Sequence, residues 1–158
     1  MTTFVKYWLP VVGWMFLMFG WSTDLMSAEH TSRFLEPFLR WLSPDISNAT
    51  IALIHLAVRK AAHLSEYAVL AVFLARLISF QLSETTGILP LVVAFVCAVA
   101  FAAADEFHQS FVPSRTASGY DVAIDSFGAI VGVIIYDSLA RRVRRSSRTR
   151  SRDAAERS

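Results

Sequence analysis

Polar residues that could do chemistry gather at the ends of apolar stretches in this sequence. The densest group occupies positions 104–125, between the apolar runs Ile88–Ala104 and Val122–Leu139. Each run is about as long as a bilayer core is thick, at a rise of ~1.5 Å per helical residue. A charge near the bilayer centre costs roughly 2.5–3.5 kcal/mol or more, so charged residues that extend into such runs indicate a functional site or a specific partner.

The chemistry of these side chains suggests two roles. Clustered carboxylates titrate at different pH values and histidine titrates near neutrality, as general acid–base chemistry requires. The candidates for that catalytic role are His63, Glu66, Asp105 and Glu106. Other polar side chains of the same region could bind a ligand, namely Lys60, Tyr67, Gln109, Arg115, Asp121 and Asp125.

Several candidates share one face of a helix. Lys60, His63 and Tyr67 follow one another at i, i+3 and i+7, a spacing that aligns side chains along a helix. A second stripe has a spacing of i, i+4, i+7 and i+11, and consists of Asp121, Asp125, Gly128 and Gly132. Its two glycines allow a neighbouring helix to approach closely. The sequence therefore predicts that the polar groups converge in one pocket at the ends of three helices.

Three interpretations of this cluster stay open. In the first it is a catalytic or ligand site, where Lys60 and Arg115 hold an anionic group such as phosphate. In the second it is a network of salt bridges and hydrogen bonds that holds the helices together, because Arg59, Lys60 and Arg115 roughly balance the acids. In the third it relays protons or ions, which is disfavoured because few polar residues continue through the other half of the spans.

Metal and cofactor chemistry have weak support in the sequence. His63, His108 and the nearby carboxylates could ligate zinc, but no His-x-x-x-His or Cys-x-x-Cys pair fixes a geometry, and Lys60 opposes a cation. We therefore predict neither a metal nor a cofactor. Cys97 is the single cysteine, which excludes an intrachain disulfide. Whether the chain catalyses a reaction is left open.

The elements that must position these residues are membrane helices. The 158-residue chain is 54% hydrophobic and only 18% charged, with a mean hydropathy of +0.45, values typical of membrane proteins. The apolar runs predict spans near 7–22, 60–80, 88–106 and 122–139. The fold class we predict is all-α: a polytopic membrane protein built as a bundle of four transmembrane helices.

Local signals refine these spans. The first apolar run (Tyr7–Trp21) is rich in aromatic residues, which favours a retained helix over a cleaved signal peptide. Ser47 or Asn48 is a candidate N-cap for the second helix, which could run unbroken from Ala49 to Ser79. Apolar residues recur at helical spacing within 34–42, between charged ones. They predict a short amphipathic helix in the first outer loop, either in the headgroup plane or capping the bundle.

Charge predicts the orientation. Residues 141–158 hold eight arginines and two acids, a charge of +6, so residues 1–140 carry −4 of the chain's +2. Basic segments stay in the cytoplasm, so four spans place both termini there and the polar cluster in the outer leaflet. We expect this basic tail to be disordered because it has few apolar residues. Nucleic-acid binding by the tail is disfavoured, since a basic terminus on a membrane protein usually signals topology.

Two motifs resemble a known family. RKAAHLSEYAVL at residues 59–70 resembles the first motif of the VanZ-like membrane proteins. DEFHQSFVPSR at 105–115, followed by DVAIDSFG at 121–128 and by Gly132, resembles the second. The resemblance covers about residues 50–135 in the right order and spacing. Ser114 departs from the glycine common after the proline, which bears on the geometry of the turn.

The resemblance implies a role in the cell envelope. The family consists of small proteins of the bacterial inner membrane, and its namesake is associated with low-level resistance to the glycopeptide teicoplanin. Residues 1–140 would be the VanZ-like transmembrane domain and 141–158 the cytoplasmic tail. The expected partners are membrane lipid and a lipid-linked envelope precursor or a lipoglycopeptide. The alternative is a non-catalytic structural or interaction protein, because the resemblance supplies no reaction.

Overall fold

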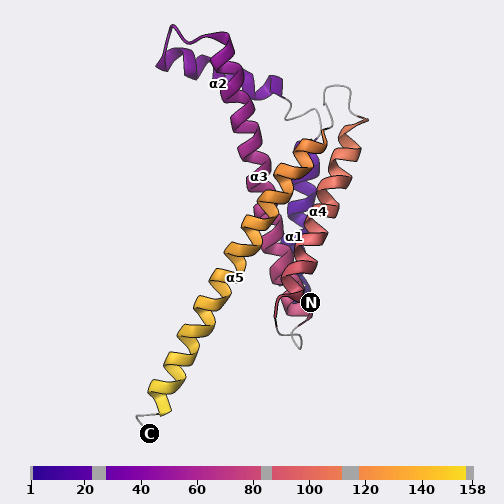
Figure 1. The fold of residues 1–158 in the computed structure, drawn as a ribbon, viewed down its shortest axis with the longest axis vertical. Coiled ribbons are helices and arrows are strands. Elements are labelled where there is room, and N and C mark those ends of the chain that lie inside the picture. The colour runs from indigo at the N-terminus through magenta and orange to yellow at the C-terminus, as the bar shows by residue number, and fades with distance from the viewer. Residues whose placement is uncertain (1, 23–27, 83–86, 112–117, 156–158) are drawn as a thin grey trace.

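Helices account for the secondary structure of the described part of the chain. The computed structural model describes residues 2–22, 28–82, 87–111 and 118–155. They form α1 (Thr2–Ser22), α2 (Ala28–Leu42), α3 (Asn48–Gln81), α4 (Leu89–Gln109) and α5 (Gly119–Ala155), as Figure 1 shows. All but α2 are long and apolar enough to cross a membrane. The predicted all-α membrane protein with four spans is confirmed.

The membrane helices alternate in direction in the order in which they follow along the chain. Tyr7 of α1 stacks on Phe80 of α3 with ring centroids 4.1 Å apart, and Trp14 meets Phe73 edge-on at 6.1 Å. Early residues of α1 thus meet late residues of α3, so the two helices are antiparallel. We call the end of the bundle where α3 ends and α4 begins the lower end. Both termini point toward it in Figure 1, and α4 ends at the opposite, upper end.

Helices α3 and α5 run parallel in close contact. A Cβ atom on Gly128 would overlap the backbone oxygen of Leu64, and one on Gly132 would overlap that of Ala68. No residue larger than glycine fits at this separation. Because positions 64 and 68 meet 128 and 132, these two contacts fix the register of α5 against α3.

Small side chains form the core beside this contact. Ala71, Ala98 and Ala129 are buried where α3, α4 and α5 meet. Helix α1 adds Met18 to a second cluster. Large apolar side chains such as Ile134 point outward, as lipid-facing residues do. The helices therefore associate through close backbone contact rather than through a large interior, as membrane helices do.

Local sequence determines where two of the spans begin. The Ser47 hydroxyl accepts a hydrogen bond from the Thr50 backbone N–H at 3.1 Å, which satisfies one of the free N–H groups at the start of α3. This confirms Ser47 as the N-cap. Pro90 occupies the first turn of α4, where its missing N–H costs nothing.

Helix α2 is amphipathic and lies outside the bundle. It packs against α3 alone among the described helices and sits at the upper end in Figure 1. Arg40 binds Glu36 at 3.0 Å and the Asn48 side chain at 2.7 Å, which ties α2 to the start of α3. Phe34 and Trp41 remain 82% and 77% exposed. The aromatic face of α2 is thus not buried by the protein.

Two helices extend beyond the predicted spans. Helix α3 begins at Asn48, twelve residues before the span predicted near 60–80, as the longer interpretation of this region allowed. Helix α5 continues to Ala155, through the tail for which the sequence predicted disorder. Arginine favours helices, and Arg141 binds Asp137 one turn earlier at 2.7 Å. Because the tail has few apolar residues, it cannot form a packed core. The same composition does not end α5, which continues into the tail from the membrane span.

Candidate functional site

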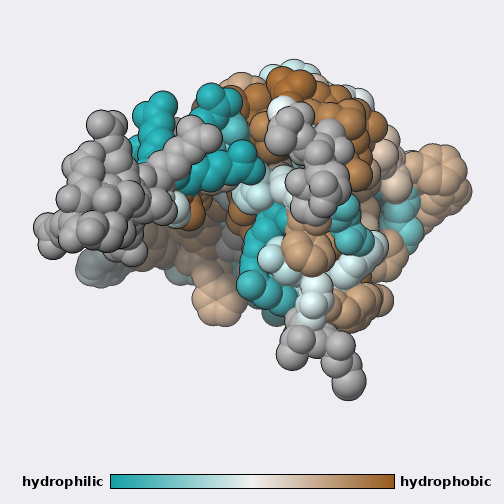
Figure 2. Space-filling view, turned by 90° about the horizontal axis from the view of Figure 1, so that it is seen from below, coloured by the Kyte–Doolittle hydropathy of each residue, from teal (hydrophilic) through white to brown (hydrophobic). Residues whose placement is uncertain are grey.

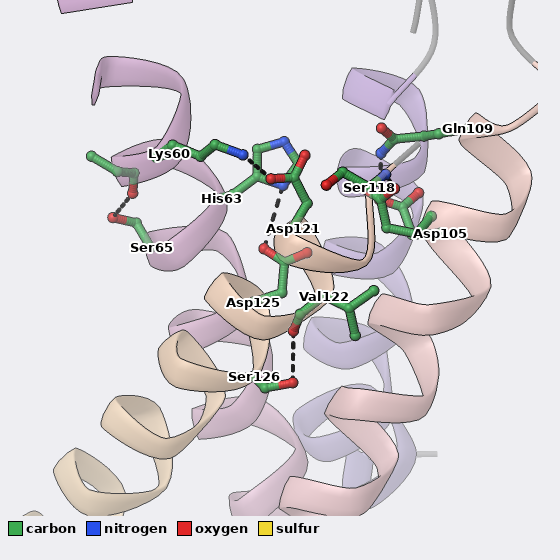
Figure 3. A network of polar contacts seen from close by, with 12 residues as sticks. Lys60, His63, Ser65, Asp105, Gln109, Ser118, Asp121, Val122, Asp125 and Ser126 are labelled. Carbon is green, nitrogen blue, oxygen red and sulfur yellow. Dashed lines mark hydrogen bonds and ion pairs between the residues drawn. The ribbon is translucent and has the colours of Figure 1, made fainter. Parts of the chain in front are cut away.

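Buried and partly buried polar side chains gather near the upper end of the bundle, where α3, α4 and α5 meet. We call this set the polar layer. It comprises eight of the predicted site residues: Lys60, His63, Tyr67, Asp105, Glu106, Gln109, Asp121 and Asp125. In Figure 3, Lys60 and His63 reach from α3 toward Asp121 and Asp125 on α5. The structure therefore brings together residues that are up to 65 positions apart in the sequence.

Two ion pairs join α3 to α5 in this layer. The Lys60 ammonium contacts an Asp121 carboxylate oxygen. One turn lower, Nδ1 of His63 lies 3.4 Å from Oδ1 of Asp125. The second pair is an ion pair only while the imidazole is protonated. The two pairs follow from the stripes predicted on α3 and α5, since the glycine contacts below them fix the register.

The end of α4 supplies two more buried acids. Gln109 Nε2 donates to Asp105 Oδ2 at 2.9 Å, one turn apart on the same helix. The backbone N–H of Ser118 donates to Glu106 Oε2 at 2.7 Å, which ties α4 to the start of α5. Each carboxylate therefore has one oxygen that accepts a hydrogen bond from the protein.

Tyr67 lies between these two groups. Its side chain is only 1% exposed and packs with Met18, Leu70 and Ala102. The hydroxyl is close enough to Asp105, Asp125, Glu66 and Glu106 to interact with them electrostatically. It forms no hydrogen bond within the described residues. Tyr67 thus adds a buried hydroxyl from α3 to the acids of α4 and α5.

Several buried atoms of the layer have no hydrogen-bond partner among the described residues. They are Tyr67 OH, Asp105 Oδ1, Glu106 Oε1 and Gln109 Oε1. His63 Nδ1 and Asp125 Oδ1 also lack a hydrogen bond, although they face each other at 3.4 Å. Buried polar atoms in folded proteins almost always have partners, because an unpaired one costs about 1–3 kcal/mol. Most of these atoms are acceptors. The layer can therefore receive groups that donate hydrogen bonds.

The charge of the layer is also one-sided. It holds four carboxylates but only one lysine and one histidine, and Glu66 and Arg59 lie near them on α3. Arg59 keeps its Nε buried without a partner in the described part of the chain. The Lys60 ammonium already forms an ion pair with Asp121 in the described structure. The arrangement is thus suited to a cationic or hydroxyl-bearing group more than to a second anion.

Two predicted site residues differ from the rest. Glu66 is half-buried on α3, and its backbone oxygen accepts a hydrogen bond from the Trp14 indole at 3.0 Å. Arg115 lies outside the described residues, as does Ser114 in the same turn. Among the residues that are described, no three His, Cys, Asp or Glu side chains form a group that could hold a metal ion.

Sequence reasoning missed other members of the site. The Ser118 N–H binds Glu106, and the signal for it was a serine just before a helix start. Trp14 had no signal, because nothing in the α1 sequence indicates which helix its indole meets. His108 was considered from the sequence only as a possible zinc ligand. In the structure its ring packs on Phe19 with centroids 4.5 Å apart, and its buried Nδ1 lacks a partner in the described segments.

Comparison with known protein families identifies the family of this chain. Residues 4–141 match the family model VanZ/LLP1, which spans all four membrane helices and the whole polar layer. No curated protein and no solved structure matches the chain.

Proposed function

This chain belongs to the VanZ/LLP1 family, and from that premise we propose that it acts in the bacterial cell envelope through its polar layer. The layer binds the polar head of an amphiphile in the outer leaflet of the inner membrane. That amphiphile is an envelope lipid, a lipid-linked precursor or a lipoglycopeptide of the teicoplanin type. Its apolar part stays in the lipid or against the lipid-facing sides of the helices.

The observation that carries this proposal is the set of buried acceptors without partners. Asp105, Glu106 and Gln109 each keep one side-chain oxygen without a partner among the described residues while being at least nine-tenths buried. A network that served only to hold helices would gain stability by pairing these atoms. Leaving them unpaired is reasonable if a ligand completes the network.

The chemistry of the layer suggests which ligand groups enter it. Carboxylate and amide oxygens accept hydrogen bonds from hydroxyl and ammonium groups. Sugar hydroxyls and amines are therefore the groups we expect beside Asp105 and Gln109. Arg115 remains the expected contact for an anionic group, because Lys60 contacts Asp121.

The charges of the lower end support the proposed orientation. Lys6 and Arg76 lie over the Tyr7 ring, at 5.4 and 5.0 Å from its centroid. Arg141 and Arg144 follow on α5. Basic residues at helix ends favour the cytoplasmic side. Both termini would then be cytoplasmic, and the exposed aromatic face of α2 would lie in the outer headgroup region.

A second candidate function is purely structural. The Lys60–Asp121 pair and the glycine contacts hold α3 against α5. The chain would then be an interaction protein of the membrane whose polar layer keeps three helices in place. Removing a layer residue would in that case reduce the amount of folded protein.

The proposal is tested by susceptibility to two glycopeptides that differ in a lipid tail. Cells with and without the chain are compared for teicoplanin, which carries the tail, and vancomycin, which does not. We expect protection against teicoplanin only, and loss of protection in Asp105→Asn. Asp45→Asn, the same chemical change at an exposed position outside the layer, should protect as the unmodified chain does. Equal protection by both variants at equal abundance would contradict the proposal.

A further inference from the structure

A groove opens between α4 and α5 at the lower end, away from the polar layer. It has a volume of about 1130 Å³. Its upper walls are apolar, with Val92 and Phe95 on α4 and Ile130 and Ile134 on α5. In Figure 1, α5 diverges from α4 toward this end.

The groove ends in arginines. Arg141, Arg144 and Arg145 contribute to its lining, together with the acid Asp137. Arg141 binds Asp137 at 2.7 Å, so the acid is neutralised within the lining. Figure 2, which looks at the molecule from below, shows groups of hydrophilic side chains next to hydrophobic surface. The lining is thus apolar at one end and cationic at the other.

The arginines lie at the level of a membrane surface. Gly132 meets Ala68 in the parallel register of α5 and α3, so Arg145 is as far below that contact as Gln81, the last residue of α3. Gly87 and Ile88, just before α4, line the same end of the groove. From Ile130 to Arg145 the helix covers about 22 Å, close to half of the ~40–45 Å of a bilayer with its headgroups.

We infer that this groove binds an anionic phospholipid of the lower leaflet. Its acyl chains lie along Val92, Phe95 and Ile134, and its phosphate lies against Arg144 and Arg145. Charge and polarity both fit such a lipid, because the lining changes from apolar to cationic at the depth where a lipid changes from acyl chain to phosphate. Arginine binds phosphate with its planar fork of donors. This inference is independent of the proposed function at the upper end.

Two other occupants fit less well. A soluble phosphate would meet the arginines but leave the apolar walls exposed. A second copy of this chain packed on the groove would bring its own arginines against these, which repel. Both alternatives are outcomes of the test.

The test titrates purified full-length protein in detergent with phosphatidylglycerol or with phosphatidylcholine of the same acyl chains. Native mass spectrometry counts the lipids bound. We expect the anionic lipid to bind about fivefold more tightly for each arginine engaged. Arg144→Gln and Arg145→Gln should each lose about that factor, and Ile134→Trp, which fills the apolar part, should weaken binding of the lipid. Arg142→Gln is the matched control, because it removes the same charge from the same helix but is not part of the lining.

Four results would overturn the inference. The first is equal binding of the two lipids. The second is an equal loss of lipid affinity in Arg142→Gln and Arg144→Gln, which would mean that only the net charge of the tail attracts the lipid. The third is displacement of the lipid by inorganic phosphate at the same concentration. The fourth is a dimer in the mass spectrum that Ile134→Trp abolishes, which would assign the groove to a second copy.

Discussion

At the scale of single residues, Asp121 and Asp105 show two uses of a buried carboxylate. Asp121 contacts the Lys60 ammonium, so its charge is matched within the protein. Asp105 receives one hydrogen bond from Gln109, and its second oxygen has no partner among the described residues. The first arrangement stabilises the contact between two helices, whereas the second leaves an acceptor for a ligand.

The Lys60–Asp121 pair should therefore behave as a structural contact. Asp121→Asn leaves the ammonium without its counter-charge, and Lys60→Met leaves the carboxylate without one. Each should lower the free energy of unfolding by on the order of 2 kcal/mol, below the value for a fully buried pair because Lys60 is 28% exposed. Thermal unfolding in detergent measures this loss. The double variant should lose less than the sum of the two, and an additive loss would show that the pair is not coupled.

The sequence predicted the residues of the polar layer but not their pairing. Lys60, His63 and Tyr67 lie on one helix face by spacing alone, as do Asp121 and Asp125. Which base meets which acid depends on the axial register of α3 against α5. Two close backbone contacts set that register, and helical spacing within one element carries no information about it.

At the scale of elements, the glycines of α5 determine how close two helices come. Gly128 and Gly132 lie directly below Asp121 and Asp125 on the same face. Their contacts with Leu64 and Ala68 involve backbone atoms, which cannot move aside as a flexible side chain can. The distance between the acids of α5 and the bases of α3 thus depends on these two positions.

Gly132→Ala should force α5 away from α3. An added methyl group collides with the Ala68 backbone oxygen, so the thermal unfolding temperature and the binding of a ligand in the layer should both fall. Gly13→Ala in α1 is the control, because its added methyl group meets no atom within 4 Å. Alanine also favours helix there by up to ~1 kcal/mol. If the two variants unfold at the same temperature, the close contact does not matter for stability.

The helix ends illustrate which elements were predictable. Apolar run length gave the four spans, and the serine cap gave the start of α3. The amphipathic pattern predicted α2 but not whether it packs on the bundle, because the pattern is the same whether the aromatic face contacts lipid or protein. The extension of α5 to Ala155 was not predicted, because the composition of the tail indicates disorder while the helix propensity of its arginines continues the span.

At the scale of the whole molecule, acids and bases separate along the bundle. The buried acids of the described chain lie at the upper end. The lower end carries Lys6 and Arg76 on α1 and α3, and the arginines of α5. This separation predicts the orientation, since basic residues are retained in the cytoplasm during insertion.

Reporter fusions test that orientation. A reporter fused after Arg150 should report a cytoplasmic location. A reporter inserted near Ser114 should report an external location. With an even number of spans, the end of α5 lies on the same side of the membrane as the start of α1. The connection between α4 and α5 then lies on the opposite side. The reverse pair of activities would place the polar layer in the inner leaflet and exclude an outer-leaflet ligand.

Tyr67→Phe distinguishes most directly a polar layer that binds a ligand from one that only holds helices together. This change removes one buried hydroxyl that has no hydrogen bond within the described residues and leaves the packing of the ring with Leu70 and Ala102 in place. The measurement is the amount of folded, membrane-inserted protein per cell together with teicoplanin protection. We predict unchanged abundance, because an unpaired hydroxyl adds no stability, and loss of protection. Abundance and protection that fall in the same proportion, or protection that survives at full abundance, would contradict ligand binding by the layer.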